Sequence, residues 1–141
     1  MTGGTMADGT RTRHGSCHCG AVRFAADVDL ARGTIRCNCS LCTKQRNWAA
    51  IVPASAFRLL AGDGALTEYR CNTRTERHLF CATCGVRPFG TGTSPRWGEY
   101  VAISVHCLDD LPDAERAALP VTYLNGRDDD WEHPLADAHR L

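Results

Sequence analysis

The chain has 141 residues, and its 16 lysines and arginines balance 16 aspartates and glutamates, so the formal net charge is zero. This length suits one domain with a core of its own, and the even charge without a basic block argues against nucleic-acid or membrane-surface partners. No apolar run approaches the roughly 20 residues of a spanning helix, and the first residues lack the apolar middle of a signal peptide, so we expect a soluble cytoplasmic protein.

The chain begins with a segment rich in Gly and Thr that has too few apolar side chains to pack. We therefore expect residues 1–14 to be disordered and residues 15–141 to form a single zinc-binding domain. Short β-like runs follow, separated by Gly, Pro or Asn: 21–26, 48–52, 57–60, 66–70, 77–80, 86–90 and 99–105. Their brevity and regular turn signals predict an antiparallel, all-β domain.

One short helix is expected near the C-terminus, from about Pro112 to Leu119, because Pro stands early in a run that favours helix. The tail after it, residues 125–141, is polar and rich in turn residues. We expect this tail to wrap around the surface.

Nine cysteines are many for a cytoplasmic protein, where closely spaced cysteines more often bind metal or act in catalysis than form disulfides. Seven of them fall into three clusters: Cys17 and Cys19; Cys37, Cys39 and Cys42; and Cys81 and Cys84. The remaining two, Cys71 and Cys107, stand alone and are expected to be small buried hydrophobic residues.

The stretch 81-CATCG-85 is typical of a zinc knuckle, in which a tight turn aims two thiolates at one point and the glycine accepts a positive φ. One knuckle supplies two ligands, and Cys17 and Cys19 are the natural partners because both clusters abut a β-like run. These four cysteines would make a closed structural site. The triplet is left with three ligands, the number that catalytic zinc sites use while keeping one position open.

The chain also resembles the glutathione-dependent formaldehyde-activating enzyme family, which includes centromere protein V, from about Gly15 to Asp110. The resemblance rests on GSCHCGAVRF at 15–24, CNCSLCTK at 37–44, LTEYR at 66–70 and FCATCG at 80–85. It implies a β-tent of small antiparallel sheets organised around zinc. It also implies two Zn²⁺ per chain: a structural ion on Cys17, Cys19, Cys81 and Cys84, and a catalytic ion on Cys37, Cys39 and Cys42 whose open position can accept a thiol.

The function implied by the resemblance is a carbon–sulfur lyase that adds a thiol such as glutathione to formaldehyde or a related aldehyde. Zinc lowers the pKa of a bound thiol, and the resulting thiolate is the nucleophile. His78 and Lys44 are candidate general acids, and Arg46 or Arg87 could hold a glutathione carboxylate. For each of these four residues a surface or structural role is the simpler expectation.

Three residues near the triplet depart from the family pattern: Asn38, Thr43 and Asn47 stand where His, Arg and Gly are often found. Asn47 is expected to adopt the positive φ that Gly would. Asn38 and Thr43 are expected to flank the open metal position, with Trp48 beside them.

Two alternatives remain open, because function must be argued at the site and not from the fold. A non-catalytic, zinc-stabilised binding module would close the triplet site with Cys71, Cys107 or a histidine, although the chain lacks the basic patch of a nucleic-acid module. A thiol redox or metal-storage protein would use the triplet without zinc.

Overall fold

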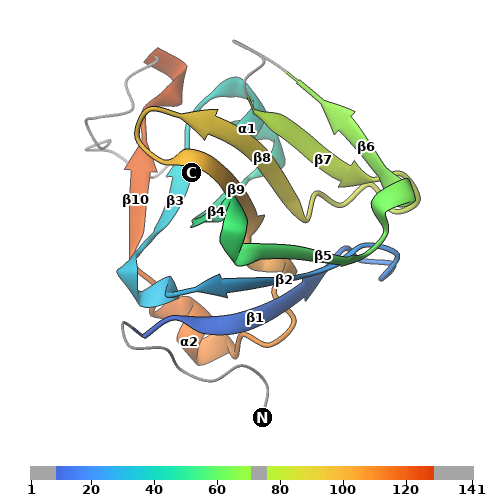
Figure 1. Cartoon of the computed structure of the whole chain (residues 1–141). Helices are drawn as coiled ribbons and strands as arrows, with labels where there is room; N and C mark the ends of the chain where they lie inside the picture. The colour runs from blue at the N-terminus through green and yellow to red at the C-terminus, as the bar shows by residue number, and fades with distance from the viewer. Residues whose placement is uncertain (1–8, 71–75, 129–141) are drawn as a thin grey trace.

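The computed structural model describes residues 9–70 and 76–128, which form two β-sheets and two short α-helices (Figure 1). The smaller sheet has three strands in the order β1 (Arg11–Ser16), β2 (Arg23–Val28) and β5 (Phe57–Ala61). The larger has seven, in the order β10 (Val121–Leu124), β3 (Thr34–Cys37), β4 (Trp48–Pro53), β9 (Gly98–Ser104), β8 (Phe89–Ser94), β7 (Arg77–Cys81) and β6 (Leu66–Tyr69). The helices are α1 (Ser40–Gln45) and α2 (Asp113–Ala117).

The prediction of a mostly β domain is confirmed. Neighbouring strands pair antiparallel throughout both sheets except for β10 and β3, which run parallel. The larger sheet is therefore mixed, a feature that the prediction of small antiparallel sheets did not contain.

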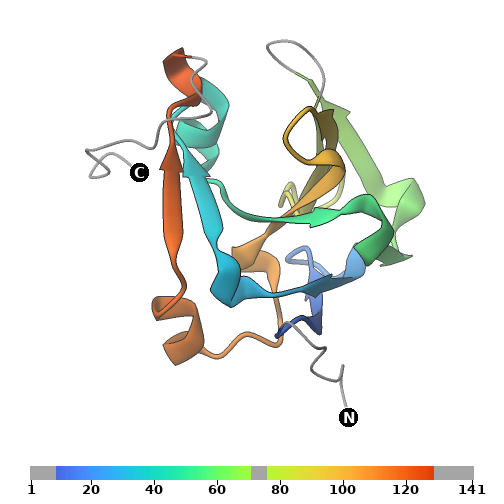
Figure 2. The same ribbon diagram turned by 60° about the vertical axis from the view of Figure 1, so that its left-hand side comes forward.

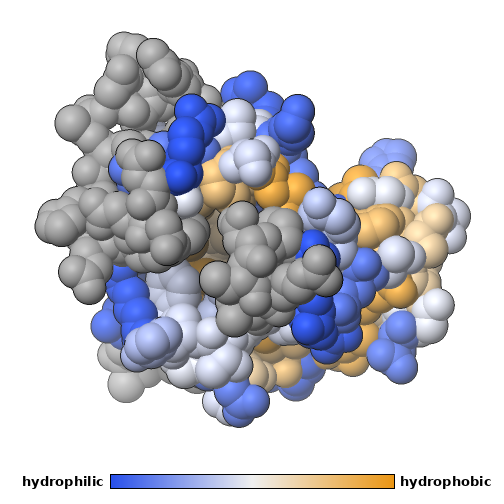
Figure 3. Space-filling model, turned by 90° about the horizontal axis from the view of Figure 1, so that it is seen from above, coloured by the Kyte–Doolittle hydropathy of each residue, from blue (hydrophilic) through white to orange (hydrophobic). Residues whose placement is uncertain are grey.

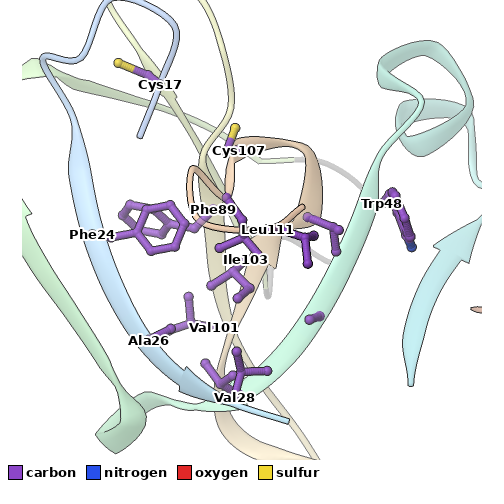
Figure 4. Close-up of a cluster of buried hydrophobic side chains, with 14 of the residues drawn as sticks. Cys17, Phe24, Ala26, Val28, Trp48, Phe89, Val101, Ile103, Cys107 and Leu111 are labelled. Carbon is purple, nitrogen blue, oxygen red and sulfur yellow. The ribbon is translucent and has the colours of Figure 1, made fainter. Parts of the chain in front are cut away.

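The main core lies between the two sheets and is centred on aromatic side chains (Figure 4). Phe24 of β2 stacks on Phe57 of β5 with ring centroids 5.5 Å apart, and Phe57 meets Phe89 of β8 at 4.6 Å. Ile103 of β9 is completely buried beside them. Aromatic contacts of this kind add to the burial energy of the rings, so the core holds the small sheet against β8 and β9.

The larger sheet has a second buried face, opposite the main core. Along β9 the side chains alternate, so that Val101 and Ile103 join the main core while Tyr100 and Ala102 join a separate cluster with Ala49 of β4. Alternation with a period of two is the normal geometry of a strand. Both faces of the centre of this sheet are thus covered.

Residues 11–14, which the sequence predicted to be disordered, belong to β1, so this part of the prediction is wrong. The strand is ordered because Arg13, only 6% exposed, donates to the Asp110 carbonyl at 3.0 Å and also bonds to Glu115. Its backbone pairs with β2 in continuous register. Residues 1–8 lie outside the described residues.

The helix expected near the C-terminus is confirmed as α2, which begins directly after Pro112. The other helix, α1, was not predicted, and neither were β1, β3 and β10. The run predicted at 86–90 is shifted, because β8 begins at Phe89, directly after a proline that cannot donate to a ladder. The expected course of the tail falls mostly on residues 129–141, outside the described residues.

Helix α1 lies at the end of the molecule where β3 and β10 terminate, and α2 lies at the opposite end (Figure 2). Seen from the α1 end, hydrophobic surface is exposed in two places separated by hydrophilic residues (Figure 3). Among the described residues, no helix has the length and apolar character needed to cross a membrane.

Candidate metal centres

Two similar turns bring the first four cysteines together. Cys17 and Cys19 lie in the turn between β1 and β2, Cys81 ends β7, and Cys84 lies in the turn after it. In each turn a glycine adopts a positive φ, +82° at Gly20 and +80° at Gly85. The four sulfur atoms lie within 4.8 Å of one another, as the knuckle pattern predicted.

The spacing of these sulfur atoms fits a tetrahedral metal ion. Zinc–sulfur bonds of about 2.3 Å at tetrahedral angles place neighbouring sulfurs about 3.8 Å apart. The Cys17 and Cys19 sulfurs are 3.7 Å apart, and those of Cys19 and Cys81 are 3.6 Å apart. These two distances therefore match those expected around Zn²⁺.

Backbone N–H groups are directed at the sulfurs of this cluster. Val22 N lies 3.3 Å from Cys17 Sγ, and Thr83 N lies 3.4 Å from Cys81 Sγ. The N–H of Val86, followed by that of Cys19, lowers the pKa of Cys84 to about 6. Hydrogen bonds to the charged form favour thiolate, which is the form that binds metal.

The triplet forms at the junction of β3 and α1. Cys37 is the last residue of β3, Cys39 caps the N-terminus of α1, and Cys42 lies within the helix. The backbone N–H of Cys39 lies 3.3 Å from Cys37 Sγ, and that of Cys42 lies 3.4 Å from Cys39 Sγ. Their three sulfurs also lie within 4.8 Å of one another.

The charge balance of the triplet calls for a cation. Hydrogen bonds from the Cys37 and Cys42 thiols lower the pKa of Cys39 to about 2. The hydrogen bond with Cys39 raises the pKa of Cys37, and those with Cys37 and Cys39 raise the pKa of Cys42. The three sulfurs thus share hydrogen bonds with one another, and three thiolates at this spacing would repel unless a positive ion lay between them. These residues fit a metal centre with three protein ligands.

The triplet has an apolar wall that the sequence analysis did not foresee. Trp97, in the turn between β8 and β9, packs against the cluster that contains Cys37, Cys39 and Leu124, together with Ile35 and Leu41. Trp48 does not flank the triplet as expected. It belongs to the main core, where its Nε1 donates to Thr34 Oγ1 at 2.7 Å, and in Figure 4 it lies across β4 from Phe24.

Of the three departures from the family pattern, the expectation for Asn47 is wrong, while Asn38 and Thr43 make hydrogen bonds of their own next to the triplet. The amide of Asn38 donates to Asn125 at 2.9 Å and accepts from Arg127 N at 2.9 Å, while Thr43 donates to the Asn38 carbonyl at 3.1 Å. Both side chains are therefore used in loop contacts. The positive φ, 54°, falls on Arg46, which ends α1, and Asn47 has no such backbone strain.

A buried polar cluster lies on the second face of the large sheet, close to the triplet. Arg87 Nη1 donates to Asn47 Oδ1 at 2.6 Å, and Glu76 Oε2 lies 3.9 Å from Arg87 Nη2 and 3.4 Å from His78 Nε2. Tyr100 donates its hydroxyl hydrogen to Glu76 Oε1 at 3.1 Å. The cluster reaches the triplet through Asn47, whose Nδ2 lies 3.9 Å from Cys42 Sγ.

The four candidates for acid–base or carboxylate roles divide into two pairs. His78 and Arg87 are buried in this polar cluster, and burial lowers the pKa of His78, so its imidazole is neutral at pH 7. Lys44 and Arg46 are exposed on α1. Sequence reasoning missed Glu76 and Tyr100. The two glycines at alternate positions of β8, Gly90 and Gly92, could have indicated that large side chains pack against one face of this strand.

The two lone cysteines bear on whether the triplet is closed by a fourth ligand. Cys107 is buried in the main core, as predicted, and its thiol donates to the Arg87 carbonyl at 3.6 Å. Among residues 9–70 and 76–128, the side chains able to hold a metal form two groups, one of four cysteines and one of three. Neither group includes a histidine or a further cysteine from these residues. Cys71, His133 and His139 lie outside the described residues.

The remaining histidines stand apart from both clusters. His14 pairs with Asp110 at 3.2 Å, and His106 meets the Trp48 ring edge-on at 5.2 Å. His18, between two cysteines of the first cluster, is exposed.

Comparison with known proteins identifies a family and a similar solved structure. The model of the family described as glutathione-dependent formaldehyde-activating enzyme matches residues 12–124. The crystal structure of a Rhodobacter sphaeroides protein is similar with a TM-score of 0.66 and 31% sequence identity, over 77% of this chain and 99% of that one.

Proposed function

Because this chain belongs to the glutathione-dependent formaldehyde-activating enzyme family, we propose that it is a zinc-dependent carbon–sulfur lyase. It would bind a thiol such as glutathione at the triplet and join it to formaldehyde or a related small aldehyde. The observation that carries this proposal is the presence of a cluster of three cysteines beside a separate cluster of four. Four ligands suit a structural ion and three suit an ion that exchanges a ligand.

The seven cysteines would divide into two roles. Cys17, Cys19, Cys81 and Cys84 would hold a structural Zn²⁺ between the two turns. Cys37, Cys39 and Cys42 would hold a second Zn²⁺, which, when bound, supplies the positive charge that keeps a substrate thiol deprotonated near neutral pH.

The proposed reaction adds a thiol across a carbonyl group. The sulfur forms a bond to the carbonyl carbon, the π pair of the C=O bond moves to oxygen, and the proton lost by the thiol ends on that oxygen. With glutathione and formaldehyde the product is S-hydroxymethylglutathione, and carbon–sulfur cleavage is the reverse. No oxidant or reductant is needed.

Other residues of the chain would shape the site around the thiol. Trp97 and Leu41 give it an apolar wall that limits water, which strengthens electrostatic interactions there. The backbone N–H of Cys39 and that of Cys42 hold two of the ligand sulfurs in place. The exposed Arg46, one turn from Cys42, is the better placed of the two arginine candidates for a glutathione carboxylate, since Arg87 is buried.

The experiment measures exchange between formaldehyde hydrate and S-hydroxymethylglutathione at equilibrium by magnetisation-transfer NMR, with the zinc-loaded protein present. We expect faster exchange than with the same free thiol in buffer, because the uncatalysed addition is itself quick and sets the background. Cys39→Ser should return the rate to that background. The matched control is Cys107→Ser, which changes a buried cysteine outside both clusters and should keep the rate.

A second readout separates binding from catalysis. Glutathione added to the loaded protein should release a proton and change the fluorescence of Trp97, which packs against the triplet. Both changes without faster exchange would leave a thiol-binding module, and the proposed lyase activity would be wrong. The absence of both changes would mean that the triplet site is closed.

A further inference from the structure

We infer that Arg87 is a positioning residue for the second metal site: it holds the amide of Asn47 so that this amide donates a hydrogen bond to the Cys42 sulfur. The inference rests on the proposed metal-binding role of the triplet and is independent of catalysis. It assigns a use to the buried polar cluster, which no step of the proposed reaction requires.

Arginine fixes which way the Asn47 amide faces. A guanidinium has donors alone, and Arg87 Nη1 lies 2.6 Å from Asn47 Oδ1, so the oxygen of the amide must face Arg87. The nitrogen then faces the opposite way, toward Cys42, and Asn47 Nδ2 lies 3.9 Å from Cys42 Sγ. Arg87 thus orients the Asn47 amide so that its N–H group faces the Cys42 sulfur.

The Arg87 side chain is itself held in place. It is 7% exposed and packs over Gly90, where a Cβ atom would come within 2.4 Å of Arg87 Nη2. Glu76 supplies the opposite charge at 3.9 Å and is fixed in turn by Tyr100. A glycine at position 90 is what allows the guanidinium to lie across the strand.

The arrangement is not the one that stability alone would select. Among the described residues, Arg87 Nε and Nη2 are buried without a hydrogen-bond partner. Buried polar groups left without a hydrogen bond destabilise a fold, even where, as here, the charge itself is paired with Glu76. The hydrogen bond that the buried guanidinium does make is the one from Nη1 to Asn47. Since Asn47 in turn contacts Cys42, this bond points to a role at the triplet.

A hydrogen bond to a ligand sulfur stabilises the deprotonated, metal-binding form. Partners of this kind typically change metal affinity by 10- to 100-fold when they are removed. Asn38 offers a contrast at the other end of α1, because it lies between two ligands but its side chain bonds to Asn125 and Arg127. The affinity of the triplet should therefore depend on Asn47 and not on Asn38.

The test uses the full chain with Zn²⁺ in the first site and Co²⁺ titrated into the second against a chromophoric chelator. Asn47→Asp keeps an acceptor for Arg87 but has no N–H to donate, so we expect affinity at the second site to fall about 10-fold or more. The charge-transfer band from sulfur to Co²⁺ should also shift. Asn38→Asp adds the same charge at the other end of α1, between Cys37 and Cys39, and should cause neither change.

Unchanged affinity and spectrum in Asn47→Asp would overturn the inference, since a purely structural role for Asn47 would survive that substitution. Equal losses in Asn47→Asp and Asn38→Asp would overturn it too, because added charge alone would then explain them.

The role of Arg87 is tested by a double-mutant cycle. Arg87→Lys keeps the charge but loses the planar fork, and it should weaken the second site as Asn47→Ala does. If Arg87 acts through Asn47, the double variant binds Co²⁺ no more weakly than Asn47→Ala alone. Additive losses would show that Arg87 acts by another route.

A spectroscopic measurement covers the case in which Arg87→Lys does not fold. In the unmutated protein loaded with ¹¹³Cd, scalar coupling between the metal and the Asn47 side-chain amide protons should be visible across the N–H···S bond. No such coupling, while the Cys39 and Cys42 backbone amides show theirs, would refute the inference without any variant.

Discussion

Glycines at positions 90 and 92 leave room for two large side chains on one face of β8. A Cβ atom at Gly92 would lie 2.7 Å from the Tyr100 hydroxyl and 2.8 Å from its ring carbon Cζ. Neither Gly90 nor Gly92 has a positive φ, so here glycine is needed for space and not for backbone freedom. Because strand residues two apart share a face, these two glycines together create the room in which the polar cluster sits.

Gly92→Ala should therefore displace Tyr100 and weaken its bond to Glu76. Overpacking a close-packed region typically destabilises by about 1–3 kcal/mol, and we expect a loss in that range by urea denaturation. The control is Gly64→Ala, where nothing lies within 4 Å of the new Cβ and φ is not positive. Equal stability of the two variants would show that Tyr100 moves aside without cost.

Helix α1 is too short to be stable by itself. It has six residues, whereas isolated helices below about 12–15 residues are marginal in water. Its first turn is held by the Cys39 sulfur, which accepts from Cys42 N, and its end by the bond from Asn47 N to the Cys42 carbonyl at 3.1 Å. The helix therefore depends on Cys39, which caps it, and on Cys42, which it contains.

Removal of the second metal by a mild chelator should loosen α1 and leave the sheets intact. The amides of Thr43 and Asn47, which bond to carbonyls of Cys39 and Cys42, should lose protection in hydrogen exchange. Those of Val101 and Ile103 in β9 should keep theirs. Uniform loss of protection would mean that the triplet metal supports the whole fold.

Another contact between secondary-structure elements links the N-terminal strand β1 to α2. Arg13 of β1, buried, bonds to Glu115 of α2 and to the Asp110 carbonyl. Arg13→Met should destabilise the protein by roughly 1.5–3 kcal/mol, the range for hydrogen bonds to charged groups. Arg58→Met is the comparison, because Arg58 pairs with Asp27 at an exposed site, and its loss should stay below about 1 kcal/mol.

These elements also show what the sequence could and could not predict. Strands such as β4 and β9 were predicted because their apolar runs carry local signals. Strand β1 was missed because RTRHGS reads as polar, and part of its order comes from Asp110 and Glu115, about a hundred residues away. Helix α1 was missed because its stability comes from cysteine sulfurs, and β10 because a parallel partner leaves no local pattern. The cysteine clusters were predictable because ligand spacing is local.

At the scale of the whole molecule, the two metal centres are attached to different parts of the fold. Cys17 and Cys81 belong to the main core, where Cys81 is fully buried, while Cys37 and Cys39 belong to a separate, smaller cluster. The first centre joins the turn after β1 to the end of β7, and so joins the small sheet to the large one. The second closes only a local loop.

Loss of the two centres should therefore have unequal effects. Structural zinc contributes an apparent binding free energy of roughly 10–16 kcal/mol, comparable to the stability of a whole domain. We expect Cys84→Ser to unfold the protein and Cys39→Ser to spare the fold, reducing about two zinc ions per chain to about one. Circular dichroism and metal analysis check this, and equal melting of both variants would contradict the division of roles.

The order in which the ligands occur along the chain has a consequence for biosynthesis. All three cysteines of the triplet are synthesised before Cys81 and Cys84, and so are Cys17 and Cys19. At about 5–20 residues per second, the 42 residues from Cys42 to Cys84 (84 − 42) take roughly 2–8 s to add. Five cysteines have been made when that interval begins, Cys71 and Cys81 are added during it, and the set of four is complete only with Cys84. A nascent chain that captures zinc early must therefore exchange ligands later, so we expect metal supply during translation to govern the yield of correctly loaded protein.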